Sequence, residues 1–122
     1  LESSGPFDII WNLDEEFTDL YHQQLRFSKT VLLGNIPDYS IPPNENTFTS
    51  QLRQVVACLH DNGKVLVHCF AGHGRTGMAL ACIKVALDNL SSADALNFSQ
   101  RECNGPEREE QVHFVLRIAK VS

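Results

Sequence analysis

The spacing of apolar residues predicts three strands in the first half of the chain. Apolar side chains alternate at positions 7, 9, 11 and 13, which is typical of a strand with one strongly apolar face. Two continuous apolar runs, residues 31–33 and 65–67, suit the interior of a sheet covered on both sides. The acidic residues 14–16 predict the first turn of a helix that extends to residue 24. Residues 34–43 contain three prolines and a glycine, which predict a stiffened loop.

Helical periodicity dominates the second half. Apolar residues spaced by three and four predict an amphipathic helix over residues 47–62, closed by Gly63 at a left-handed cap position. Residues 76–87 are apolar almost all round, as in a helix buried within a domain. Ser91 and Asp94 form a capping box for a helix to about Cys103, and a last helix is expected over 107–121. This order predicts one α/β domain, with a central mainly parallel sheet flanked by helices.

Composition narrows the class of protein. The 122 residues carry a formal net charge of -5, so we expect no nucleic-acid partner, and any anion must be bound locally. The longest nearly uncharged apolar stretch, residues 78–83, is far shorter than the ~18 residues that a membrane span needs. No secretory signal is visible at the N-terminus, which makes a cytoplasmic or nuclear location the expectation. The four cysteines contain no CxxC pair, and no metal site is expected.

One segment, residues 65–77, combines a strand, a glycine-rich turn and the start of a buried helix. Such a turn directs backbone N–H groups inward, and the N-terminus of the helix adds partial positive charge, so the segment can surround a phosphate. The planar guanidinium of Arg75 can bind two phosphate oxygens at once. Cys69 stands where the strand ends, and the same field favours its thiolate form. The hydroxyl of Thr76 can donate a hydrogen bond to that sulfur, and we expect His68 to orient the turn.

Three other interpretations of this segment were weighed. Residues 72–77 match G-x-G-x-x-G, but a dinucleotide fold needs a second strand ending in an acid about 20 residues later, and helices follow here instead. A Walker loop needs lysine where Arg75 stands. Inert burial is the usual state of a lone cysteine and is the expectation for Cys58, Cys82 and Cys103. For Cys69 that interpretation leaves the glycines and Arg75 unexplained.

The sequence His68-Cys69-Phe70-Ala71-Gly72-His73-Gly74-Arg75-Thr76-Gly77 resembles the signature loop H-C-x-x-G-x-x-R-[ST]-G of the cysteine-based protein tyrosine phosphatase superfamily. The resemblance implies the fold of the compact dual-specificity and kinase-associated members. It also implies that Cys69 is the nucleophile, that Arg75 clamps the phosphate and that the Thr76 hydroxyl assists the second step. The implied phosphate-binding residues are Phe70, Ala71, Gly72, His73, Gly74 and Arg75. No cofactor or metal is implied.

Two further segments extend the resemblance. Ile36–Pro42 is similar to the family loop W-P-D-x-G-x-P, which makes Asp38 the candidate general acid. The stretch from Arg101 to Phe114 resembles the end of the compact domains, where Gln111 supports the loop or a water. Glu107 replaces the glutamine that positions a water in tyrosine-specific members. Members also carry a strand and a helix before the strand near Phe7. These are absent here, so residues 1–122 are either a shortened or a minimal single phosphatase domain.

The resemblance implies hydrolysis of phosphate monoesters through a cysteinyl-phosphate, with phosphotyrosine, phosphothreonine or phosphoserine in proteins as the expected substrate. A phosphoinositide phosphatase is the first alternative, although lipid-acting members carry lysines where this chain has Phe70 and His73. A non-catalytic module that binds phosphoproteins is the second, and it is disfavoured because such modules usually lose the Cys, Arg or Asp. The absence of a basic groove opposes an RNA triphosphatase. The late position of Cys69 opposes a low-molecular-weight phosphatase or an arsenate reductase.

Overall fold

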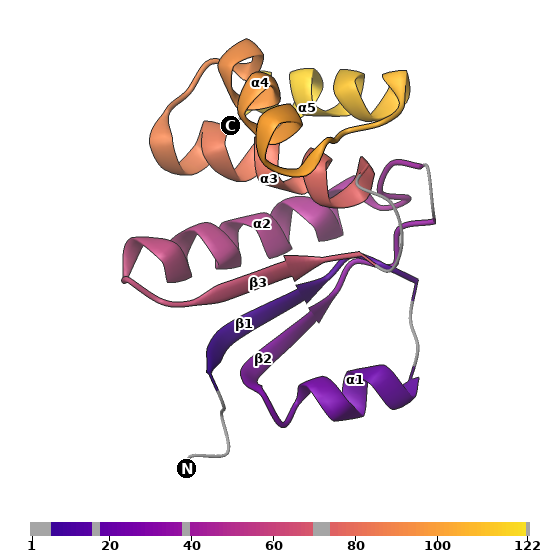
Figure 1. Ribbon diagram of the computed structural model, residues 1–122, viewed down its shortest axis with the longest axis vertical. Coiled ribbons are helices and arrows are strands. Elements are labelled where there is room, and N and C mark those ends of the chain that lie inside the picture. The colour runs from indigo at the N-terminus through magenta and orange to yellow at the C-terminus, as the bar shows by residue number, and fades with distance from the viewer. Residues whose placement is uncertain (1–5, 16–17, 38–39, 70–73, 122) are drawn as a thin grey trace.

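The computed structural model describes residues 6–15, 18–37, 40–69 and 74–121 and contains a sheet between two layers of helices (Figure 1). The elements follow one another as β1 Phe7–Asn12, α1 Thr18–Gln24, β2 Ser28–Leu33, α2 Glu45–His60, β3 Val65–His68, α3 Gly74–Asp88, α4 Ser92–Cys103 and α5 Glu109–Val121. Helix α1 covers one face of the sheet, and α2 to α5 lie over the other (Figure 1). The predicted α/β class, with helices flanking a parallel sheet, is confirmed.

The three strands are all parallel, in the order β2-β1-β3. Ile9 pairs with Thr30 on one side and with Val65 on the other, so β1 is the central strand. The carboxyl ends of the three strands therefore meet at one edge of the sheet, where ligand sites of open parallel sheets form.

The burial of the three strands differs from the prediction. β1 buries the side chains on both of its faces, because helices cover both faces. Ile9 and Trp11 point to one face, and Ile10 and Asn12 point to the other. The continuous apolar runs of β2 and β3 are both half-buried, because each lies in an edge strand among the described residues. A continuous apolar run was therefore a wrong indicator of the sheet interior here.

Helix α2 starts earlier than predicted, because Asn44 is its N-cap and accepts a hydrogen bond from the backbone N–H of Thr47. At its C-terminal end the left-handed residue is Asn62, with φ of 63°, and not Gly63. Gly63 is required for another reason. A Cβ there would collide with the sulfur of Cys58.

Helix α3 begins at Gly74, two residues before the predicted start, so Arg75 belongs to its first turn. Its core face is apolar almost throughout, as expected for a helix packed between α2, α4 and α5. A Cβ on Gly77 would overlap the backbone of Gly105, so this glycine permits close contact with the segment before α5. The predicted cap of α4 is confirmed, since Ser91 accepts from the N–H of Asp94.

Candidate active site

Cys69 lies at the edge of the sheet where β3 ends. The main chain just before it is held by β1, since Leu13 N–H donates to the His68 carbonyl at 2.8 Å. The Thr76 hydroxyl donates to the Cys69 sulfur, with 3.0 Å between Oγ1 and Sγ. The cysteine is half-buried, and Thr76 is in the first turn of α3. A strand end and a helix start thus place the sulfur and a hydroxyl donor in direct contact.

Arg75 is almost completely buried, with 2% of its surface exposed. Its Nη1 atom donates to Asp14 Oδ1 at 2.7 Å and to the Ile36 carbonyl at 2.8 Å. These partners come from the segments that follow β1 and β2, so parts of all three strand-end loops converge on Arg75. The guanidinium is positioned by an ion pair before any phosphate arrives.

Asp14 corrects the sequence interpretation, which placed it among acids in the first turn of α1. The helix starts only at Thr18, and Asp14 is buried at 6% exposure. The Asn12 side chain accepts from the Asp14 N–H at 3.0 Å, and Asp14 itself accepts from the Glu15 N–H at 2.8 Å. The available signal was its position directly after a strand, at the carboxyl edge of a parallel sheet.

A chain of buried polar side chains continues from Asn12 to His68. The Asn12 amide donates to Gln24 Oε1 at 3.5 Å, and Gln24 Nε2 lies 2.6 Å from His68 Nε2. Burial lowers the pKa of His68, while the Asp14 carboxylate acts more weakly in the opposite direction. A neutral imidazole accepts the Gln24 hydrogen bond at Nε2. The ring is thereby oriented by α1, one residue before Cys69.

Gln111 is fully buried and joins three segments. Its Oε1 atom accepts from the backbone N–H groups of Glu107 and Arg108, at 3.1 and 3.2 Å. Its Nε2 atom donates to the Ser40 carbonyl at 3.0 Å. Gln111 therefore joins the start of α5 to the loop after β2, and its role beside the signature loop or a water stays a prediction.

Glu107 contacts Gly74, and Glu107 and Gln111 together form a brace at the start of α5. Glu107 Oε1 accepts from the Gly74 N–H at 3.1 Å, at the first residue of α3. A Cβ at Gly74 would lie within 2.5 Å of Gln111 Oε1, so the glycine permits the approach. The segment before α5 therefore contacts both the start of α3 and the loop after β2.

Five of the candidate residues lie outside the described part of the chain. They are Asp38, Phe70, Ala71, Gly72 and His73. Two residues near Asp38 in the sequence are described and contact other candidate residues: the Ile36 carbonyl accepts from Arg75, and the Ser40 carbonyl accepts from Gln111. The placement of Asp38 as the acid stays a prediction.

The other cysteines have a different environment from Cys69. Burial raises the pKa of Cys82 to about 12, and it also raises the pKa of Cys58 and Cys103. All three are therefore held as thiols at neutral pH.

Among the described residues, no cluster of His, Cys, Asp and Glu side chains could hold a metal ion. No helix in the described part of the chain is long and apolar enough to span a membrane.

A parallel sheet with a cysteine at a strand end, in contact with a hydroxyl in the first turn of the next helix, is the arrangement of one class of proteins, the cysteine-dependent phosphatases. A family model described as "Polymorphic toxin system, DSP-PTPase phosphatase" matches residues 7–88. The chain belongs to this family, within the protein tyrosine and dual-specificity phosphatases.

Curated relatives of this chain include a protein that is named as a tyrosine phosphatase. The chain is 38% identical over 84 residues to the tyrosine-protein phosphatase non-receptor type 61F of Drosophila melanogaster, covering 65% of this chain and 15% of that protein. It is 28% identical over 89 residues to the cyclin-dependent kinase inhibitor 3 of Sus scrofa, covering 71% and 39%. The chain thus spans well under half the length of these relatives.

Solved structures share the fold. The crystal structure of Tk-PTP in its active form has a TM-score of 0.78 and 26% identity, covering 94% of this chain and 80% of that chain. A kinase-associated phosphatase whose catalytic cysteine is replaced by serine has a TM-score of 0.74 and 18% identity, covering 95% and 70%; at that identity it supports the fold alone.

Proposed function

We propose that this chain hydrolyses phosphate monoesters on proteins through a cysteinyl-phosphate intermediate. The observation that carries the proposal is the contact between the Thr76 hydroxyl and the Cys69 sulfur, beside a buried arginine. A hydroxyl that donates to sulfur stabilises the thiolate, and the thiolate is the nucleophilic form of cysteine. An inert core cysteine does not require a hydroxyl donor and a buried arginine in the first turn of the helix that follows it.

In the first step the Cys69 thiolate attacks phosphorus, forming an S–P bond while the P–O bond to the leaving group breaks. The Arg75 guanidinium and the backbone N–H groups of the signature loop neutralise charge on the equatorial oxygens. Asp38 gives its carboxyl proton to the departing oxygen, which leaves as an alcohol or phenol.

In the second step a water attacks phosphorus and the S–P bond breaks. Asp38, now a carboxylate, takes the proton from that water, so inorganic phosphate forms and the acid is restored. The sulfur leaves as a thiolate, and the Thr76 hydrogen bond stabilises the charge that develops on it. This contact therefore matters most for breakdown of the intermediate.

Burst kinetics test this assignment. With p-nitrophenyl phosphate, Thr76→Ala should release one equivalent of nitrophenol quickly and then turn over about 10- to 100-fold more slowly than the native chain. Thr76→Ser keeps the hydroxyl and should restore the rate, and Thr49→Ala, on a helix remote from Cys69, is the matched control. Cys69→Ser should abolish turnover. Residual turnover in Cys69→Ser, or an unchanged rate in Thr76→Ala, would refute the mechanism.

A substrate panel separates the alternatives. Peptides carrying phosphotyrosine or phosphothreonine should be hydrolysed faster than a soluble inositol phospholipid, because Phe70 and His73 stand where lipid-acting members carry lysines. The opposite order would indicate a phosphoinositide phosphatase. Saturable binding of phosphopeptide without hydrolysis would indicate a binding module.

A further inference from the structure

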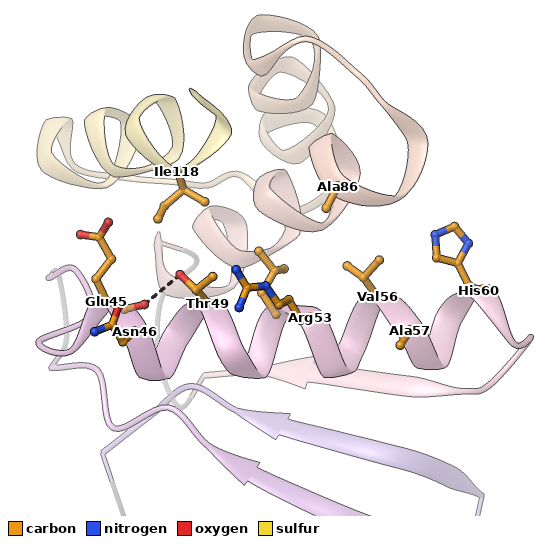
Figure 2. Close-up of a pocket in the computed structure, with 10 residues that line it drawn as sticks. Glu45, Asn46, Thr49, Arg53, Val56, Ala57, His60, Ala86 and Ile118 are labelled. Carbon is orange, nitrogen blue, oxygen red and sulfur yellow. Dashed lines mark hydrogen bonds between the residues drawn. The ribbon is translucent and has the colours of Figure 1, made fainter. Parts of the chain in front are cut away.

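A groove of about 460 Å³ lies on the opposite side of α2 from the sheet (Figure 2). One face of α2 forms most of its wall, and Ala86 of α3 and Ile118 of α5 lie across from it. The face of α2 that packs on the core uses other residues, namely Phe48, Leu52 and Val55, of which Leu52 also reaches the groove. Volumes of roughly 300–1,000 Å³ are typical of sites for small molecules.

The groove has a closed end and an open end. Near the start of α2, Phe48 packs edge-on against Phe114 of α5, with 5.1 Å between ring centroids. The ion pair between Glu45 and Arg117, at 3.2 Å, joins the same two helices. Further along α2 the facing residue on α3 is only an alanine, Ala86, and the His60 ring borders the space beside Val56 (Figure 2).

The charges around the groove are unequal. Glu45 is neutralised by Arg117, whereas Arg53 forms no ion pair with any carboxylate in the described part of the chain. Its guanidinium points from α2 toward the α3 and α5 side of the groove (Figure 2). A single positive charge beside an apolar wall of Val56, Ala57 and Ile118 is complementary to a molecule with one anionic head and an apolar body.

We propose that this groove binds an amphipathic carboxylate of the medium-chain fatty-acid type. The carboxylate pairs with Arg53, and the alkyl chain lies along Val56 and Ala57 beneath Ala86. None of the groove residues belongs to the phosphatase site, so this binding is independent of the proposed hydrolysis.

Titration calorimetry with dodecanoate, kept below its micelle concentration, tests the proposal. One saturable site is expected. Arg53→Met keeps the alkyl stem and removes the charge, and it should weaken binding about fivefold. Arg26→Met removes a positive charge elsewhere on the surface and should leave the affinity unchanged. Dodecanol, which is uncharged, should bind the native chain no better than dodecanoate binds Arg53→Met.

Ala57→Trp tests the location, because the indole would fill the groove from an exposed helix position. We expect it to weaken dodecanoate binding about tenfold or more, with an unchanged urea midpoint showing that the chain remains folded. Amide NMR shifts in the native chain should concentrate at residues 53–60, 86 and 118. Absence of a saturable site, or binding that both variants retain, would overturn the proposal.

Discussion

Arg75 and His68 stand at the two ends of the signature loop, and buried polar groups hold both. Asp14 pairs with Arg75, Gln24 bonds to His68, and Asn12 contacts both of these partners. Removing one partner of a buried ion pair strongly destabilises the folded protein, because the charge of the other partner then remains buried without a counter-ion. The site therefore depends on residues that do not touch the phosphate.

Replacing Asp14 by asparagine should destabilise the chain by about 3 kcal/mol, since Arg75 keeps its buried charge without a counter-ion. The affinity for inorganic phosphate should change as well, because the guanidinium is no longer held in one orientation. Urea unfolding and a phosphate titration measure the two effects. Glu15→Gln, at the adjacent exposed acid, is the control and should behave as the native chain. Equal stability of the two variants would show that the ion pair contributes nothing.

The His68 environment predicts a dependence of stability on pH. Burial lowers the pKa of His68 in the folded chain, whereas the unfolded chain has the ordinary value of about 6.5. Below that pH the unfolded state binds more protons, so the free energy of unfolding falls as the pH decreases from about 6.5.

Urea unfolding at pH 5.5 and 7.5 measures this effect. The difference between the two pH values should be smaller in His68→Gln than in the native chain. His22→Gln, at an exposed position on α1, should keep the native difference. A native-sized difference in His68→Gln would assign the pH dependence to other groups.

Sequence reasoning reached the residues of the signature loop and missed their partners. Cys69, Arg75 and Thr76 are seven or fewer positions apart, so local spacing was enough to group them. Asp14 is 61 positions from Arg75, and Gln24 is 44 from His68. Such pairs depend on which strands are neighbours, and a single sequence does not state the strand order.

At the scale of elements, the helices were predicted better than the strands. The period of α2 and the cap of α4 are local properties that the chain states within a few residues. Whether a strand is central or at an edge depends on its neighbours. The alternating pattern of β1 therefore did not reveal that both of its faces are buried, and the continuous run of β3 wrongly indicated the sheet interior.

Gly77 shows how contacts between elements reverse a local preference. Glycine to alanine within a helix normally stabilises by about 1 kcal/mol. Here the added methyl group meets the backbone of Gly105, so Gly77→Ala should instead destabilise by about 1–3 kcal/mol in urea unfolding. Asn97→Ala, on an exposed face of α4, should follow the normal helix preference. A stabilised Gly77→Ala would contradict the close contact.

Gln111 predicts a second effect between elements. Gln111→Met keeps the size of the side chain but leaves the backbone N–H groups of Glu107 and Arg108 and the Ser40 carbonyl without this partner. We expect a loss of about 1–3 kcal/mol in stability, and a fall in kcat that exceeds the change in KM, because the loop containing Asp38 loses an anchor. Gln54→Met, on the exposed side of α2, is the control. Native kinetics in Gln111→Met would show that the anchor is dispensable.

For the whole molecule, the formal net charge of -5 opposes the approach of acidic substrates and favours the approach of basic ones. Salt screens the long-range repulsion more than the short-range contacts. Raising NaCl from about 20 to about 200 mM should therefore increase kcat/KM for an acidic phosphopeptide about twofold and decrease it for a basic one. p-Nitrophenyl phosphate, which carries only the charge of its own phosphate group, should respond to salt less than the acidic phosphopeptide. Parallel salt responses of the acidic and basic peptides would contradict this.

The brace formed by Glu107 and Gln111 has a consequence for synthesis of the protein. During translation, Cys69 and Arg75 emerge from the ribosome before Glu107 and Gln111, which hold Gly74 and Ser40. The proposed nucleophile is therefore made before the support that orders its surroundings. Under the proposed mechanism, a translation product that ends before α5 carries the thiol and is inactive.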